Sequence, residues 1–132
     1  MKHDAEENWE NDAPHPGLPD IERHLSNVAA GDPGWVCQNF KTGESVWNSR
    51  NLGKGAVGYA DGMLYCVEES SGTVVLAEAS PKGWKEHGRF KLDPQTKIRS
   101  SRGRIWTHPV IANGKLYLRD QDLIYCYDIK AP

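Results

Sequence analysis

The sequence lacks an uninterrupted apolar run of about 18 residues, so it predicts no transmembrane helix. Its N-terminal stretch, MKHDAEENWENDAPHPG, also lacks the apolar segment of a secretory signal, and we expect no signal peptide in this chain. Cysteine is scarce: Cys37, Cys66 and Cys126 are the only three, and no C-x-x-C spacing occurs. This odd count argues against both a structural zinc site and a disulfide framework.

Basic residues are rare near the N-terminus. Residues 1–33 hold two basic and eight acidic side chains, a net charge of −6, whereas residues 34–132 hold fourteen basic and ten acidic ones, a net charge of +4. This shift indicates a boundary near residues 31–34 rather than a binding partner. Residues 1–19 contain three prolines and few large apolar groups, so we expect this segment to be disordered.

Residues 20–33 are predicted to form one short helix and a linker. Asp20 can accept hydrogen bonds from the first turn of a helix, and Gly31 supplies a stop signal for a helix over 20–31. Three apolar residues share one helical face at i, i+4 and i+7: Ile21, Leu25 and Val28.

Two patterns recur in the rest of the chain. One occurs three times, as WVCQNFK at 35–41, VVLAEAS at 74–80 and IYCYDIK at 124–130, with offsets of 39 and 50 residues. The other occurs twice, as YADGMLY at 59–65 and IANGKLY at 111–117, with an offset of 52 residues. Repeats at this spacing are typical of stacked supersecondary units, and one four-stranded propeller blade takes roughly 40 to 50 residues.

From Trp35 onward the hydrophobic period is two, which predicts strands. The predicted strands are Trp35–Phe40, Ser45–Asn48, Gly55–Ala60, Met63–Glu68, Thr73–Ala79, His87–Leu92, Ile105–Ala112, Lys115–Arg119 and Leu123–Ile129. Asp61-Gly62 and Asn113-Gly114 favour tight hairpin turns, because both residues of such a pair tolerate a positive φ. The expected fold is therefore all-β and antiparallel, with one complete four-stranded unit over 55–92 between two partial ones.

At these residues the chain resembles the PQQ-like (quinoprotein-type) β-propeller repeat proteins. The resemblance covers residues 35–132 and rests on TGESVW at 42–47, the repeated A-[DN]-G-x-L-Y and the strand ending YDIK. The tail from Gly83 to Lys130 is similar to the C-terminal blades of the bacterial polyvinylalcohol-dehydrogenase-like and outer-membrane-assembly-lipoprotein-like group. The resemblance implies a partial propeller of about two blades, and a periplasmic or exported location. Because a propeller needs typically 4 to 8 blades, we expect the chain to be a C-terminal fragment or a truncated paralogue.

Two functions from different classes follow from this resemblance. The favoured one is a non-catalytic scaffold or binding module with no cofactor of its own and a protein or polysaccharide ligand. The alternative is the C-terminal part of a quinone-dependent alcohol dehydrogenase, in which PQQ would be held with calcium. The chain has no adjacent cysteine pair and no acidic cluster placed for a hard cation, which favours the first function.

One region carries the residue types of a ligand site. The predicted binding residues are Trp106, His108, Arg119, Asp120 and Gln121. A histidine titrates near neutral pH and could bind a ligand or move a proton, but nothing places a nucleophile beside it, so we predict no catalytic residue. The alternatives are a structural histidine and a solvated hairpin with a local ion pair.

The remaining predictions concern partners. The basic run at 97–104 lacks interleaved aromatic residues, so we favour a solvated loop over a nucleic-acid site. A partial propeller exposes apolar faces that a ring would bury, so we expect self-association or docking of the missing blades. The residues proposed for these faces are Val57, Leu64, Val75, Trp84, Trp106, Leu116 and Tyr125.

Overall fold

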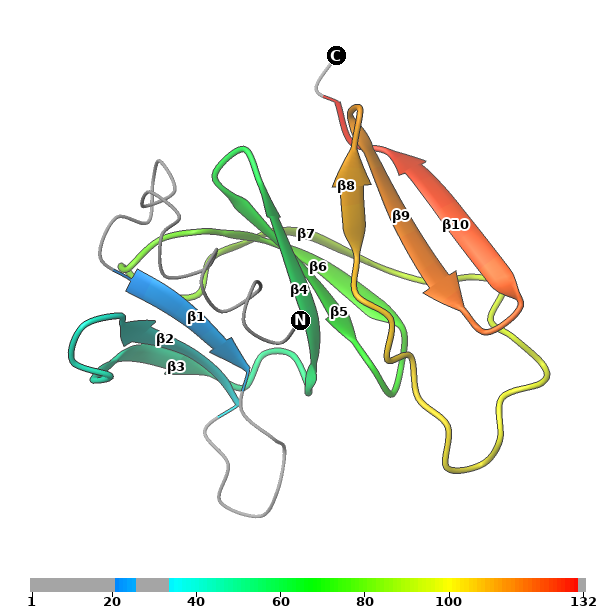
Figure 1. Ribbon diagram of the computed structural model, residues 1–132, viewed down its shortest axis with the longest axis horizontal. Coiled ribbons are helices and arrows are strands. Elements are labelled where there is room, and N and C mark those ends of the chain that lie inside the picture. Colours follow the sequence, from blue (N-terminus) through cyan, green and yellow to red (C-terminus); the bar gives the residue numbers. More distant parts are fainter. Residues whose placement is uncertain (1–20, 26–33, 131–132) are drawn as a thin grey trace, which may run out of the picture.

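A computed structural model describes residues 34–130 and the backbone of residues 21–25, which form three antiparallel sheets in chain order (Figure 1). The first sheet contains β1 (Ile21–Leu25), β2 (Trp35–Asn39) and β3 (Ser45–Ser49), paired in that order. The middle sheet contains β4 (Gly55–Ala60), β5 (Met63–Glu68), β6 (Thr73–Glu78) and β7 (Glu86–Lys91). The last sheet contains β8 (Val110–Ala112), β9 (Lys115–Asp120) and β10 (Leu123–Asp128).

The all-β antiparallel prediction is confirmed for these residues, and so is the four-stranded unit over 55–92. Its β4–β5 hairpin turns at Asp61 and Gly62, with φ of 52° and 75°. The β8–β9 hairpin turns at Asn113 and Gly114, with φ of 52° and 74°. The turn residues therefore adopt the positive φ values that their dipeptides favour.

The helix predicted over 20–31 is not found where the structure describes that range. Ile21–Leu25 is instead strand β1, antiparallel to β2, with Ile21 opposite Asn39 and Leu25 opposite Trp35. Pairing with β2 satisfies backbone groups at an edge that would otherwise stay open, which a local helix signal does not capture. The other positions of the predicted helix, and the predicted disordered segment 1–19, lie outside the described residues.

The strand predicted over Ile105–Ala112 is shorter than expected, because only Val110–Ala112 pairs with β9. Pro109 has no N–H for a strand ladder, so the pairing begins after it. The Ile105 amide instead donates to the carbonyl oxygen of Glu69 at 2.8 Å, which ties this segment to the middle sheet.

A hydrophobic cluster lies between the first and middle sheets. Trp35 is buried in it, with Trp47 and Trp84 packed against its edge. Trp35 and Trp84 have ring centroids 5.8 Å apart. All three indoles donate a hydrogen bond: Trp35 Nε1 to Gly53 O at 2.8 Å, Trp47 Nε1 to Ser80 O at 2.9 Å, and Trp84 Nε1 to Glu86 Oε1 at 3.0 Å. These bonds let large rings fill the gap without leaving a polar group unpaired.

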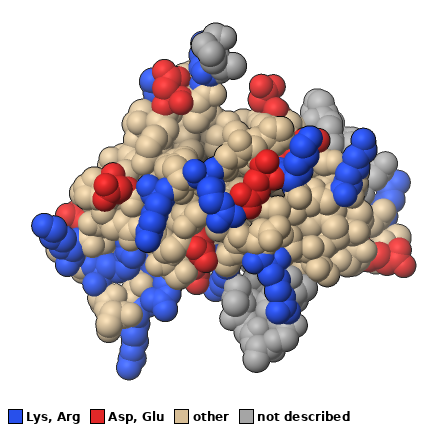
Figure 2. All heavy atoms as spheres, turned by 180° about the vertical axis from the view of Figure 1, so that it is seen from behind, with Lys and Arg blue, Asp and Glu red and all other residues tan. Residues whose placement is uncertain are grey.

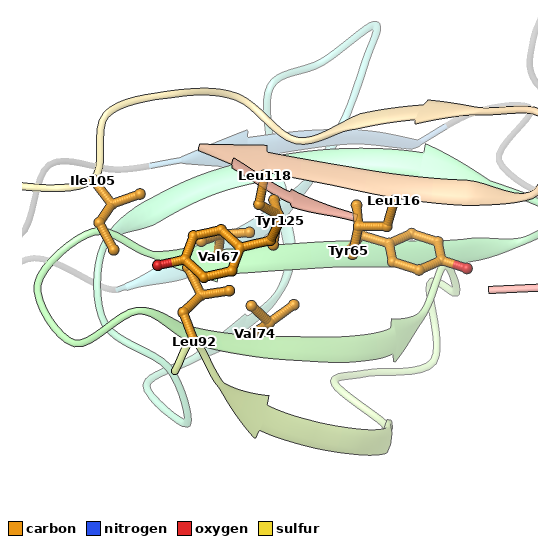
Figure 3. Packing of buried hydrophobic residues seen from close by; sticks show 8 residues of the cluster. All are labelled: Tyr65, Val67, Val74, Leu92, Ile105, Leu116, Leu118 and Tyr125. Carbon is orange, nitrogen blue, oxygen red and sulfur yellow. The ribbon is translucent and has the colours of Figure 1, made fainter. Parts of the chain in front are cut away.

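A second cluster lies between the middle and last sheets (Figure 3). Its buried members are Tyr65, Val67, Val74, Leu92, Ile105, Leu116, Leu118 and Tyr125. Side chains alternate across each strand, so one face of the middle sheet enters the first cluster and its other face enters this one. In the middle sheet, β5 and β6 are therefore largely buried on both faces between the neighbouring sheets, whereas most of β7 is exposed.

Candidate functional site

The predicted binding residues gather at one end of the last sheet. Trp106 is 65% exposed, and His108, Arg119 and Gln121 are exposed too. The hydroxyl of Thr107 donates to the carbonyl oxygen of Arg119 at 2.6 Å, which holds the Trp106–His108 segment against β9. The structure thus brings four of the five predicted residues to one surface, and their binding role stays a prediction.

Asp120, the fifth predicted residue, is directed into the protein. It is 1% exposed, and its carboxylate accepts hydrogen bonds from Arg99 and from the amide of Thr96 at 3.0 Å. Arg99 approaches with both Nε, at 3.2 Å, and Nη2. Burial by itself raises the pKa of Asp120, but these hydrogen bonds outweigh it, so the pKa lies below its ordinary value. Asp120 therefore pairs with Arg99 across the fold and not within its own turn.

This buried pair anchors the loop between β7 and β8. Tyr125 donates its hydroxyl hydrogen to Pro94 O at 2.5 Å, and Thr96 bonds the carboxylate of Asp122. Arg99 lies in the basic run that the sequence identified, but its structural role was missed. Its partner is 21 residues away in the chain, so no local pattern marks the pair.

The rest of the basic run lies at the surface. Lys97 and Arg102 are exposed, and Arg104 bonds the carbonyl oxygen of Gly103. Figure 2 shows Lys and Arg side chains at the end of the molecule where this loop lies, with acidic side chains nearby. The distribution fits the solvated loop expected from the sequence.

A second candidate surface is the face of the last sheet that points away from the middle sheet, called here the outer face. Directly paired residues of antiparallel strands share a face. The register places Val110, Tyr117 and Cys126 in one row across the sheet. The outer face therefore consists of Val110, Ala112, Lys115, Tyr117, Arg119, Ile124, Cys126 and Asp128.

The outer face is rich in exposed apolar groups. Ile124 is 75% exposed and Val110 is 57% exposed, and Cys126 is an exposed thiol. At one end, Lys115 and Asp128 approach to 3.7 Å, with side chains 43% and 71% exposed. Arg119 lies toward the other end, beside Ile124.

Most of the residues expected from the sequence to form exposed apolar faces are not exposed. Leu64, Val75, Leu116 and Tyr125 are between 0% and 9% exposed, because they lie in the two clusters between sheets. Trp106 does remain exposed. Alternation along a strand leaves open which half of these residues meets a given neighbour, and the structure shows that these four meet a neighbouring sheet of the same chain.

Comparisons with known proteins identify no relative: no family model, no curated protein and no solved structure matches this chain. In residues 34–130, no group of three or more His, Cys, Asp or Glu side chains is placed to hold a metal ion. The part of the chain that the structure describes also contains no helix long and apolar enough to cross a membrane.

Proposed function

We propose that this chain is a non-catalytic scaffold or binding module made of PQQ-like β-propeller repeats and forms part of a larger propeller. The supporting observation is that three antiparallel sheets follow one another in chain order and pack face to face. Such stacking of successive sheets through apolar side chains is how propeller blades contact one another.

The repeated sequence positions support the same proposal. Cys37, Leu76 and Cys126 occupy the same position of the sequence repeat. Each lies on the face of its sheet that is directed toward the C-terminal end of the stack. Cys37 is two residues from Trp35 on β2 and so shares its face, which meets the middle sheet. Leu76 packs against the cluster between the middle and last sheets, and Cys126 lies on the outer face. Equivalent residues thus have equivalent directions, as units of one repeat should.

The ligand of the module would bind at the exposed end of the last sheet, where Trp106, His108, Arg119 and Gln121 lie. An exposed tryptophan beside an arginine and an amide suits a protein or polysaccharide ligand, since a flat ring offers apolar contact while the polar groups supply hydrogen bonds.

A thermal-unfolding experiment tests the non-catalytic assignment. The purified chain is melted with and without pyrroloquinoline quinone and calcium, each alone and together. A ligand that binds the native state must raise the melting temperature. We expect no shift. A reproducible rise that needs both quinone and calcium would overturn the scaffold proposal in favour of the dehydrogenase alternative.

A further inference from the structure

The three strands that carry the repeat differ in their neighbours. The 39-residue and 50-residue offsets make β2, β6 and β10 equivalent. β2 pairs with β1 and β3, and β6 pairs with β5 and β7; β3 and β7 are called here the outer strands. Among the described residues, β10 pairs with β9 alone (Figure 1). The last sheet therefore lacks the outer strand that the first and middle sheets have.

The two outer strands join their sheets through the same backbone contact. The Asn39 amide donates at 2.9 Å to the carbonyl oxygen of Glu44, which precedes β3. The Glu78 amide donates at 2.9 Å to the carbonyl oxygen of Lys85, which precedes β7. Asn39 and Glu78 occupy one position of the repeat, and Asp128 is their equivalent in β10. The described residues supply no outer strand beside Asp128.

Both pairings also contain an irregularity at one position of the repeat. The register shifts between Cys37 and Gln38 where β2 meets β3, and between Leu76 and Ala77 where β6 meets β7. The 39-residue offset makes these two positions equivalent. Bulges are specific features of a pairing, so their recurrence indicates that binding an outer strand is a property of the repeat rather than of one sheet.

The unpaired edge of β10 presents regularly spaced backbone groups. The amide of Ile129 donates to the carbonyl oxygen of Gly114 at 2.9 Å, so the odd-numbered positions bond to β9. Alternation along an antiparallel strand then directs the N–H and C=O groups of Ile124, Cys126 and Asp128 to the other edge. An edge of this kind is a template for a further strand.

An aromatic ring beside this edge is only partly covered. Trp47 on β3 packs against the middle sheet, where its ring centroid lies 6.2 Å from that of Trp84, which precedes β7. Phe90 is the ring that β7 directs toward the last sheet, and its centroid lies 4.7 Å from that of Tyr127. Phe90 nevertheless stays 40% exposed. A ring at the start of an outer strand beside β10 would cover it, as Trp84 does for Trp47.

We infer that the open edge of β10 binds an extended segment of a partner polypeptide, which pairs antiparallel to β10 as its outer strand. The inference rests on the proposed repeat architecture and names the partner. The existing outer strands define its chemistry: both are largely exposed and mostly polar, with a tryptophan in or just before them. Backbone hydrogen bonds then give the affinity, and the ring on Phe90 gives the selectivity. Residues 1–20 of this chain are a poor source, because Pro14, Pro16 and Pro19 interrupt them.

The test uses the protein's own outer strand as the probe. A fluorescein-labelled peptide of residues 83–92, GWKEHGRFKL, is titrated with the full chain, and fluorescence anisotropy measures binding. We expect saturable binding. A peptide with Gly88→Pro should bind about tenfold more weakly or less, because Gly88 pairs with Leu76 in the middle sheet and proline cannot donate to a ladder. In the protein, Phe90→Ala should weaken binding, whereas Ile98→Ala, at an exposed loop position, should not.

Amide hydrogen exchange locates the bound peptide. It should slow exchange at Ile124, Cys126 and Asp128, and leave Tyr125 and Tyr127 unchanged, because the amides of these tyrosines already bond to β9. Cys126→Pro should block binding in a folded chain, since it removes an N–H that the fold does not use. Cys126→Ser is the matched control and should bind the peptide like the wild type.

Three results with the peptide would overturn the inference: no binding, equal binding of the Gly88→Pro peptide, or protection of β6 amides in place of those of β10. Protection of the β10 amides in the chain without peptide would also overturn it, because the strand would then come from this chain or from a second copy. Failure of peptide binding would leave the scaffold function standing. A rise in melting temperature that needs quinone and calcium would reject that function and leave strand binding intact.

Discussion

Leu64 and Leu116 hold the same position in two sheets and bury their side chains in the same direction along the stack. Leu64 lies in the cluster between the first and middle sheets, and Leu116 in the cluster between the middle and last sheets. They are 3% and 1% exposed. One repeated sequence motif, A-[DN]-G-x-L-Y, therefore supplies one core residue to each contact between sheets.

This equivalence predicts matched losses of stability. Leu64→Ala and Leu116→Ala should each lower the free energy of unfolding by about 2–5 kcal/mol, because each removes a buried side chain and leaves a cavity. Urea denaturation measures the loss. Ile98→Ala, at an exposed position, is the control. A loss at only one of the two leucines would contradict equal roles.

The middle sheet could be predicted from the sequence because its signals are local. Alternating apolar residues and the Asp61-Gly62 turn fix the β4–β5 hairpin without help from distant residues. The pairing of Ile21–Leu25 with β2 could not be predicted from the sequence. The open edge of a sheet can pair with any extended segment, and these residues also have the apolar spacing of a helix.

The sequence could predict where the candidate site lies in the chain, but not which of its residues point to the surface and which to the interior. The sequence indicated the turn at Arg119–Gln121, but strand alternation sends Asp120 inward and its neighbours outward. Its partner, Arg99, comes from a distant loop, and only the folded chain brings the two together.

Replacing one buried partner of the Asp120–Arg99 pair should strongly lower the stability of the protein. The two side chains are 0% and 15% exposed. Asp120→Asn leaves the arginine without its counter-charge, so the free energy of unfolding should fall by about 3 kcal/mol. Adding Arg99→Met should recover part of this loss, because the uncompensated charge is then gone. Lys85→Gln, which breaks an exposed pair with Glu78 at 3.1 Å, should leave the urea midpoint unchanged.

Acidification should erase the difference between wild type and Asp120→Asn. The pKa of Asp120 is lower in the folded than in the unfolded chain, since the Arg99 and Thr96 hydrogen bonds outweigh burial. Its contribution is therefore complete above the ordinary aspartate pKa of about 3.9, and is lost as the pH falls through the folded value. Denaturation curves at neutral pH and below about pH 3.9 should show the gap narrowing; a gap that widens in acid would contradict this assignment.

A larger residue at Gly58 should clash with its neighbours at the contact between β4 and β8. A Cβ atom at Gly58 would lie 3.3 Å from Pro109 Cγ and 3.4 Å from Ile111 Cδ1. Gly58→Val should therefore lower the free energy of unfolding by about 1–3 kcal/mol through overpacking. Gly88→Val is the matched control, because no atom lies within 4 Å of a Cβ there. Equal urea midpoints for the two variants would contradict this prediction, because they would show that moving the two sheets apart does not lower the free energy of unfolding.

The same glycine bears on the curvature of the stack. β4 and β8 are the strands at which the middle and last sheets approach most closely, and the sheets fan apart from there (Figure 1). A bulkier residue at Gly58 would push the sheets apart at this line and leave their outer strands less affected. The angle between the middle and last sheets therefore depends on the absence of a side chain at Gly58. This angle would also set how many such sheets a closed ring of the repeat could contain.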